Sequence, residues 1–259
     1  MKPAEAVRLL RFGIPPTVPF FLDKKEFQIL FFFLPKLLGH RERDKWIIGG
    51  DDGLQFRTKT PKHPTRDTKV FFHYSYPLLD LLHKHRVYTN PFYNELATCK
   101  KVLDNVVEDA RKYIAALDEE MPGYAFLRNF EAARHLHKLR IVEYDPPAKN
   151  NPVVAEKHTY FSFLTYHLWG SHEGIYTYQG KQWLPISHQK NIALLFLGRK
   201  ASLMTGGKRI LRADGTQSIE VDGGILPSII HGVVENGLVT ANHEKRRAVV
   251  GFLHVPLVL

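Results

Sequence analysis

Apolar residues recur at three- and four-residue steps between about Asn94 and Asp118, which is the period of an amphipathic helix. The apolar positions of this stretch are Val102, Val106, Val107, Ala110, Tyr113, Ile114 and Leu117. Lysine, aspartate and glutamate residues fill positions between them, so one face is apolar and the other is charged. The pattern predicts one long helix that buries a single face and ends at Met121-Pro122-Gly123.

The rest of the first half has weaker patterns. Four prolines among the first 22 residues favour an extended course over the surface. Asp23 can cap a helix that begins at Lys24, with apolar residues spaced for one buried face. The polar stretch 51–67 predicts a loop or short irregular strands that could lie over an active-site mouth, and residues 70–74 predict a short strand.

The pattern changes to that of β-strands after Leu139. Short apolar runs, separated by turns rich in Gly, Pro and Asn, continue to the C-terminus. Strands are predicted at 139–144, 158–168, 175–178, 182–186, 192–198, 201–205, 217–221, 229–235, 238–242 and 246–254. Many short strands with such turns are typical of an antiparallel sandwich or barrel. We therefore expect an α+β, mostly β fold, in which a helical N-terminal region, 1–138, packs on a jelly-roll (double-stranded β-helix) core, 139–259, as one integrated domain.

The chain of 259 residues, 44% of them hydrophobic, is long enough to bury a sizeable core. Its single cysteine, Cys99, excludes an intramolecular disulfide and any zinc site built from several cysteines. No stretch reaches the roughly 18–20 apolar residues of a membrane span, because Pro35 and Lys36 interrupt the most apolar segment, residues 29–38. We therefore expect a cytoplasmic protein without a membrane span.

The formal net charge of +10 raises the possibility of a nucleic-acid partner. Basic residues are spread from Lys2 to Arg247 without a long run, however, and no nucleic-acid-binding signature is present. An anionic small substrate, or solubility alone, explains the charge as well. We therefore expect a small-molecule partner and no nucleic acid.

The stretch 156–168 is rich in aromatic and β-branched residues and carries His158 near its start. Two later stretches complement it: residues 229–234 contain His231, and residues 246–253 begin with Arg246. Two histidines on separate predicted strands followed by an arginine are the constellation of the non-haem iron oxygenases. Their two-His-one-carboxylate triad leaves metal positions open for co-substrate and oxygen.

From Leu139 to Leu253 the sequence resembles the isopenicillin N synthase-like branch of the iron(II)/2-oxoglutarate-dependent dioxygenases. The resemblance rests on several motifs in one order: the segment 174–178, the Trp-x-Pro at 183–185, the apolar strand that ends in Gly198, His231-Gly232-Val233 and the strand that begins with Arg246. The first half of the chain is only loosely similar to that family.

This resemblance implies roles for three residues. His158 and His231 would be iron ligands, and Arg246 would hold the far carboxylate of 2-oxoglutarate, because a guanidinium pairs bidentately with a carboxylate. The implied cofactors are Fe(II) and 2-oxoglutarate, and the implied partners are molecular oxygen and a small-molecule substrate. The resemblance alone identifies no further catalytic residue.

The sequence departs from the family pattern where the third metal ligand is expected. Tyr160 stands at the position of the family's Asp, Ala248 at that of the Ser after the Arg, and Asp145 ends a strand where the family often has Tyr. Asp145 could reach the metal from the neighbouring strand, although Asp before Pro is also common in turns. Tyr160 could bind as phenolate if the metal lowers its pKa from about 10. A site with two histidines alone, or no metal at all, is also open.

Other histidines have more ordinary interpretations. His172 and Glu173 precede Gly174 in a turn-like setting, which favours the surface. Surface or packing roles are favoured for His135 and His137, and structural roles for His167, His188, His243 and His254. The sequence thus predicts a non-haem iron-dependent oxygenase that oxidises a small molecule with 2-oxoglutarate. The alternative is a catalytically degenerate or redirected jelly-roll ligand-binding protein without a complete iron site.

Overall fold

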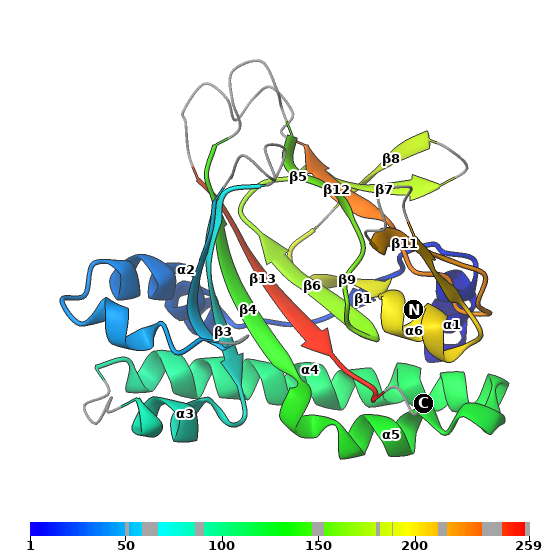
Figure 1. The fold of residues 1–259 in the computed structure, drawn as a ribbon, viewed down its shortest axis with the longest axis horizontal. Helices are drawn as coiled ribbons and strands as arrows, with labels where there is room; N and C mark the ends of the chain where they lie inside the picture. Colours follow the sequence, from blue (N-terminus) through cyan, green and yellow to red (C-terminus); the bar gives the residue numbers. More distant parts are fainter. Residues whose placement is uncertain are drawn as a thin grey trace.

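The computed structural model describes residues 1–49, 52–58, 67–85, 91–146, 153–179, 182–187, 189–211, 217–234 and 245–256. Most of its strands belong to two antiparallel sheets (Figure 1). The larger sheet has the order β1 (Thr17–Pro19), β9 (Ile192–Leu197), β6 (Leu164–Gly170), β13 (Arg246–Leu253), β4 (Lys138–Tyr144), β3 (Lys69–Ser75) and β2 (Gly53–Arg57). The smaller sheet has the order β5 (Val153–His158), β12 (His231–Val234), β7 (Ile175–Gln179) and β8 (Gln182–Ile186). A separate hairpin joins β10 (Lys208–Leu211) to β11 (Gln217–Asp222).

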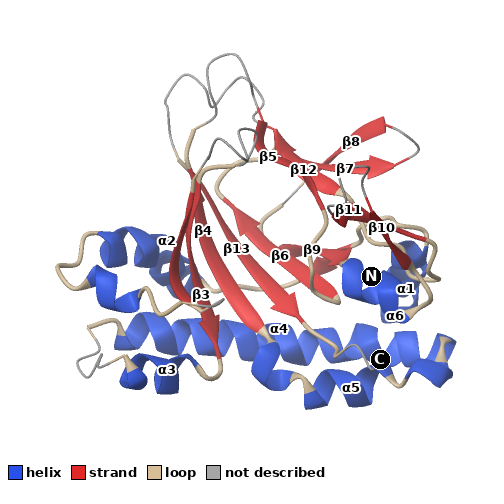
Figure 2. Ribbon diagram, in the orientation of Figure 1, coloured by secondary structure: helices blue, strands red, loops and turns tan. Residues whose placement is uncertain are grey.

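Helices cover the face of the larger sheet that lies away from the smaller one (Figure 2). They are α1 (Pro3–Arg11), α2 (Lys24–Leu38), α3 (Leu78–Lys84), α4 (Tyr93–Glu120) and α5 (Phe126–Ala132), with 3-10 turns η1 (Arg43–Trp46), η2 (Pro122–Tyr124) and η3 (Arg134–Leu136). The short helix α6 (Arg199–Met204) follows β9 and packs beside the β10–β11 hairpin instead. The long helix α4 passes close to β13, where a Cβ added at Gly251 would lie 3.0 Å from a methyl carbon of Val106. The main core fills the space between these helices and the sheet.

A second, smaller core lies between the two sheets. It combines residues of β3, β4 and β13 with residues of β5 and β12, and Tyr160 packs against it. Its members are Phe71, Val142, Tyr144, Val154, Ala155, Val233, Ala248, Val250 and Phe252. This cluster fixes the distance between the sheets beside the candidate site described below.

The structure confirms the two helices with clear sequence signals. The helix predicted from 94 to 118 is α4, and the helix predicted after Asp23 is α2. Asp23 accepts a hydrogen bond from the Glu26 amide while the Glu26 side chain accepts one from the Asp23 amide, which completes a capping box. Three strands, β1 to β3, precede residue 138 and join the larger sheet, so the sheet begins before the predicted boundary.

Two predictions about short segments were wrong. Residues 3–11 form α1 instead of an extended chain, because Pro3 occupies the first turn, where its missing N–H costs nothing, and three apolar residues form one buried face. Residues 201–205 were predicted as a strand, but α6 covers 199–204. Its Arg, Lys, Ala, Leu and Met residues are good helix formers, and an apolar run this short has no readable period. The strand predicted at 238–242 lies outside the described residues.

The strand predicted from 158 to 168 is two strands in different sheets. His158 ends β5, residues 159–163 cross the gap between the sheets, and β6 begins at Leu164. The crossing segment satisfies its backbone groups outside its own strand: the Tyr160 carbonyl accepts from the Arg199 amide at 2.8 Å, and the Phe163 amide donates to the Leu253 carbonyl at 2.8 Å. Residue pattern alone does not show such a change of partner. Within the described residues no helix is long and apolar enough to span a membrane.

Candidate metal centre and cationic cavity

Two histidines lie side by side on neighbouring strands of the smaller sheet. His158 on β5 and His231 on β12 are paired directly opposite one another, so their side chains extend from the same face. The centroids of their imidazole rings are 4.3 Å apart. Residues separated by more than seventy positions in the sequence are thus brought together by strand pairing.

Both imidazoles are held in the same orientation. Nδ1 of His158 lies 2.7 Å from the Glu156 carbonyl oxygen, and Nδ1 of His231 lies 3.2 Å from the Ile229 carbonyl oxygen. Because a carbonyl only accepts, each Nδ1 carries the proton and each Nε2 keeps its lone pair. Nε2 of His231 is buried and has no hydrogen-bond partner in the described part of the chain. A buried polar atom without a partner requires an explanation, and a bound metal would supply one.

Burial keeps both imidazoles neutral. Desolvation is the main cause that lowers the pKa of His158 to about 4 and the pKa of His231 well below its ordinary value. The positive charge of Lys69 acts in the same direction on both rings. Neutral imidazole with an available Nε2 is the form that binds a transition metal.

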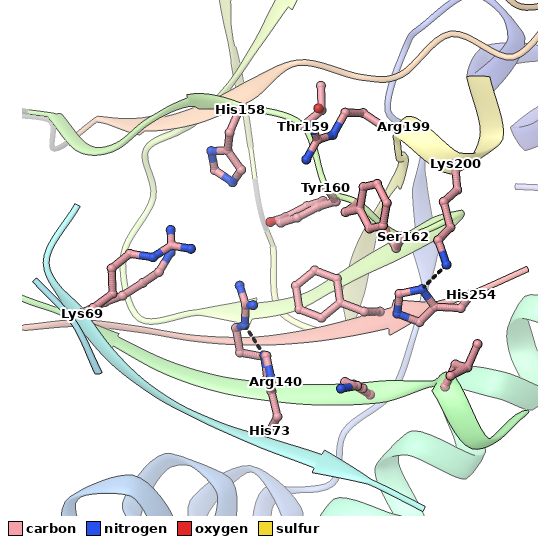
Figure 3. Close-up of a pocket in the computed structure, with 15 residues that line it drawn as sticks. Lys69, His73, Arg140, His158, Thr159, Tyr160, Ser162, Arg199, Lys200 and His254 are labelled. Atoms are coloured by element: carbon pink, nitrogen blue, oxygen red, sulfur yellow. Dashed lines mark hydrogen bonds between the residues drawn. The ribbon is translucent and has the colours of Figure 1, made fainter. Parts of the chain in front are cut away.

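Tyr160 is the third member of this cluster. Its ring centroid is 4.2 Å from that of His231 and 5.4 Å from that of His158. The rings of Phe196 and Phe252 pack around it, and burial raises the pKa of its phenol. In Figure 3 the hydroxyl of Tyr160 points to the side of the cavity where His158 lies.

The described residues contain no group of three His, Cys, Asp or Glu side chains that could hold a metal. Asp145 is 48% exposed and lies 3.7 Å from Lys245 Nζ. Its neighbour Glu143 is buried but pairs with Lys245 at 2.9 Å and with Arg247 at 2.8 Å. The structure therefore brings His158, His231 and Tyr160 together and leaves Asp145 outside the cluster.

Arg246, the first residue of β13, is buried and pairs with Tyr144 at the end of β4. Its Nη1 donates to the Glu173 carbonyl oxygen at 2.7 Å, and its Nη2 lies 3.2 Å from where a Cβ on Gly170 would stand. The guanidinium thus reaches the loop between β6 and β7, and it influences the pKa of Tyr160 by its charge. Ala248 lies buried in the core between the sheets.

A cavity of about 420 Å³ opens beside His158 and Tyr160 (Figure 3). Among the described residues, its wall contains six basic side chains, three histidines and no carboxylate. The basic residues are Arg57, Lys69, Lys138, Arg140, Arg199 and Lys200. The sequence analysis missed this site because these residues are spread over 144 positions and four elements, and only their diffuse excess was visible.

The other described histidines that the sequence analysis considered lie outside the cluster of His158, His231 and Tyr160. His172 lies in the loop before β7, where its Nδ1 is 2.7 Å from Ser171 Oγ, and Glu173 beside it is exposed. His137 and His167 are buried, and His254 contacts Lys200 in the cavity wall. His188 and His243 lie outside the described residues.

No protein-family model and no curated protein sequence matches this chain. Solved structures do match it over nearly its full length. The dioxygenase for auxin oxidation 1 from Arabidopsis thaliana, in its 2-oxoglutarate binary complex, is 14% identical, with a TM-score of 0.67 over 99% of this chain and 89% of that one. A full-length Neurospora crassa protein in complex with alpha-KG is 14% identical, with a TM-score of 0.65 over 98% and 79%.

A third solved structure, JOX2 in complex with 2OG, Fe and JA, is 12% identical, with a TM-score of 0.66 over 98% of this chain and 71% of that one. At such identities the likeness concerns the fold, and it covers both the helical layer and the sheets. The chain therefore shares the fold of these 2-oxoglutarate-binding proteins.

Proposed function

We propose that this protein is a non-haem iron-dependent oxygenase that uses 2-oxoglutarate to oxidise a small molecule. The observation that carries the proposal is the pair of neutral histidines on neighbouring strands. Both Nδ1 atoms are hydrogen-bonded to backbone carbonyls, and the buried Nε2 of His231 has no partner among the described residues. The shared fold with structures that hold 2-oxoglutarate or iron supports it. The jelly-roll arrangement expected for such enzymes is consistent with two antiparallel sheets that enclose the site.

The residues present fit an iron ion. His158 and His231 would hold it through Nε2, and Tyr160 is the nearby side chain that offers an oxygen ligand. Bound iron together with 2-oxoglutarate would supply the oxidising chemistry that no side chain can provide. Asp145 remains a less supported candidate for the third position, because it would have to leave the surface and Lys245.

The protein's own contribution would be orientation and exclusion of water. The carbonyls of Glu156 and Ile229 fix the tautomer and the rotation of the two imidazoles, as outer hydrogen bonds do in metal sites generally. The rings of Phe196 and Phe252 close one side of the cluster against water. Arg246 would receive the far carboxylate of 2-oxoglutarate, since it is buried and held in place by the Glu173 carbonyl.

An anaerobic titration tests the proposal. Iron(II) is added to the purified protein with and without 2-oxoglutarate, and optical spectra are recorded for the wild type, for His158→Ala and for His172→Ala. A weak visible band that needs both ligands should be present in the wild type and in His172→Ala, whose loop histidine lies outside the cluster. The band should be lost in His158→Ala.

Tyr160→Phe is a further variant in the same titration. If the phenol binds the metal, this variant should bind iron more weakly and shift the band, because one oxygen ligand is removed while the ring is retained. Absence of stoichiometric iron and of any band in the wild type would refute the oxygenase assignment. A ligand-binding protein without a complete iron site would then remain.

A further inference from the structure

Arg140 lies in the wall of the cavity and has no acidic partner among the residues that the structure describes. It lies on β4, and its guanidinium points toward the space between His158 and Tyr160 (Figure 3). Its Nε donates to Nε2 of His73 at 2.7 Å, and its guanidinium carbon lies 4.7 Å and 4.5 Å from the ring centroids of Phe71 and Phe252. None of these groups carries a negative charge. No described carboxylate comes within ion-pair distance of it.

Three other cations of the cavity have carboxylate partners. Arg57 and Lys69 share Asp67, at 3.2 Å and 2.5 Å, and Lys138 lies 3.4 Å from Asp52. Arg140 therefore differs from these three cations in having no described carboxylate partner. Arg140 is half-buried, and a guanidinium partly withdrawn from water is costly unless a counter-charge accompanies it, so the arrangement indicates an anionic ligand.

Lys200 is the second cation of this kind, on α6 across the cavity from Arg140 (Figure 3). Its Nζ lies 3.4 Å from Nδ1 of His254 and 5.5 Å from the ring centroid of Phe161. Burial lowers the pKa of Lys200, and no described carboxylate offsets that effect. Its contact with neutral His254 holds the ammonium at the cavity wall and leaves its charge for a ligand.

Building on the proposed function, we propose that the cavity binds the substrate that the enzyme oxidises and that this substrate is a dicarboxylate. One carboxylate pairs with Arg140 and the other with Lys200. The Nε of Arg140 is occupied by His73, so its two Nη atoms remain to grip a carboxylate in the plane of the guanidinium. A volume of about 420 Å³ suits a small organic molecule.

The site is separate from the one proposed for 2-oxoglutarate. Arg246, assigned to that co-substrate, is directed at the Glu173 carbonyl and is not part of the cavity wall. Arg140 and Lys200 are therefore assigned to an anion other than the co-substrate. The rings of Phe161 and Phe252, which contact the two cations, would cover the apolar body of the substrate.

Calorimetric titration with rigid aromatic dicarboxylates tests the inference. Isophthalate and terephthalate are titrated into the full-length protein without metal, and the uncharged diamides isophthalamide and terephthalamide serve as probes of the same shape. At least one dicarboxylate should bind with one equivalent per chain, and its diamide should not. Arg140→Gln and Lys200→Gln should each weaken that binding about tenfold to a hundredfold, because each removes one charge-assisted contact.

Arg43→Gln is the matched control, since Arg43 is exposed and pairs only with its neighbour Asp44 in the described part of the chain. This variant should bind the dicarboxylate as the wild type does. Lys200 is at the end of the cavity and outside both cores, so Lys200→Gln remains informative if Arg140→Gln folds poorly. Equal binding of diamide and dicarboxylate, or wild-type affinity in both variants, would overturn the inference.

A second titration distinguishes substrate from co-substrate. Repeated with manganese(II) and saturating 2-oxoglutarate, the dicarboxylate should bind with unchanged stoichiometry. Its displacement by 2-oxoglutarate, mole for mole, would assign Arg140 to the co-substrate and overturn the inference. Failure of the proposed function would be seen elsewhere, as missing iron binding in the optical titration, while the metal-free titration would still report the anion site.

Discussion

Close contact with Gly198 holds the crossing segment 159–163, which carries Tyr160, in place. Replacing Gly198 by alanine should therefore lower both the stability of the protein and its affinity for iron. A Cβ at this residue would lie 2.1 Å from the Ser162 carbonyl oxygen and 2.7 Å from the Tyr160 carbonyl oxygen. The backbone of Gly198 has φ of −93°, which alanine adopts without strain, so only the lack of space opposes the substitution. Cβ atoms essentially never come within 3.0 Å of such atoms, so the two segments must separate by about 1 Å.

That separation has a cost which can be estimated from the contacts. The Gly198 amide donates to the Phe163 carbonyl at 2.9 Å, and the Arg199 amide donates to the Tyr160 carbonyl at 2.8 Å. Each such bond contributes about 1 kcal/mol net, and overpacking of a well-packed site costs about 1–3 kcal/mol. We therefore expect Gly198→Ala to lower the free energy of unfolding by about 3–5 kcal/mol if both bonds are lost.

Urea unfolding followed by circular dichroism measures the loss, and the iron titration measures its effect on the site. Gly123→Ala is the control, because a Cβ at Gly123 has no neighbour within 4 Å. The control should unfold within about 0.5 kcal/mol of the wild type, and iron should bind more weakly to Gly198→Ala alone. Wild-type stability and wild-type iron affinity in Gly198→Ala would refute the claim that this contact positions Tyr160.

Three further predictions concern the framework. Burial lowers the pKa of His137 from 6.5 to about 3, so the unfolded chain binds the extra proton between these values and stability falls as the pH drops. Between pH 7 and pH 5 the free energy of unfolding, measured in urea, should fall by about 2 kcal/mol less in His137→Gln than in the wild type. Equal falls in the two proteins would contradict the lowered pKa of His137. Asp118 accepts from the amides of Phe126 and Leu127 at 2.6 Å and 2.8 Å, so Asp118→Ala should cost about 1–2 kcal/mol in the same assay, whereas no loss would show that these bonds are not formed. Tyr166 donates to Asp109 at 3.1 Å, and Tyr166→Phe should lower the thermal midpoint by removing this bond to a charged group; an unchanged midpoint would count against it.

The elements with a strong period could be predicted from the sequence. Helix α4 follows from its apolar steps, α2 from the Asp23 cap, and β4 and β13 from their β-branched runs. Short or interrupted segments could not be predicted, because their structure depends on tertiary partners. The break after His158 is set by Gly198 and its neighbours, some forty residues away.

Some residues of the candidate site could likewise be predicted from the sequence, and others could not. The order of the motifs around His158, His231 and Arg246, and the resemblance they carry, nominated these residues, and strand pairing then placed the two imidazoles together. Arg140 and Lys200 gave no signal, because each is one of 36 basic residues and only the fold shows which of them lack a carboxylate.

Anomalous diffraction at the iron edge tests the central claim most directly. Crystals grown without oxygen in the presence of iron(II) should show one strong anomalous peak per chain, at bonding distance from Nε2 of both His158 and His231. The same map would show whether the Tyr160 oxygen completes the site. A map without a peak at the two imidazoles, at full iron saturation, would contradict the metal centre on which the proposed oxygenase function depends.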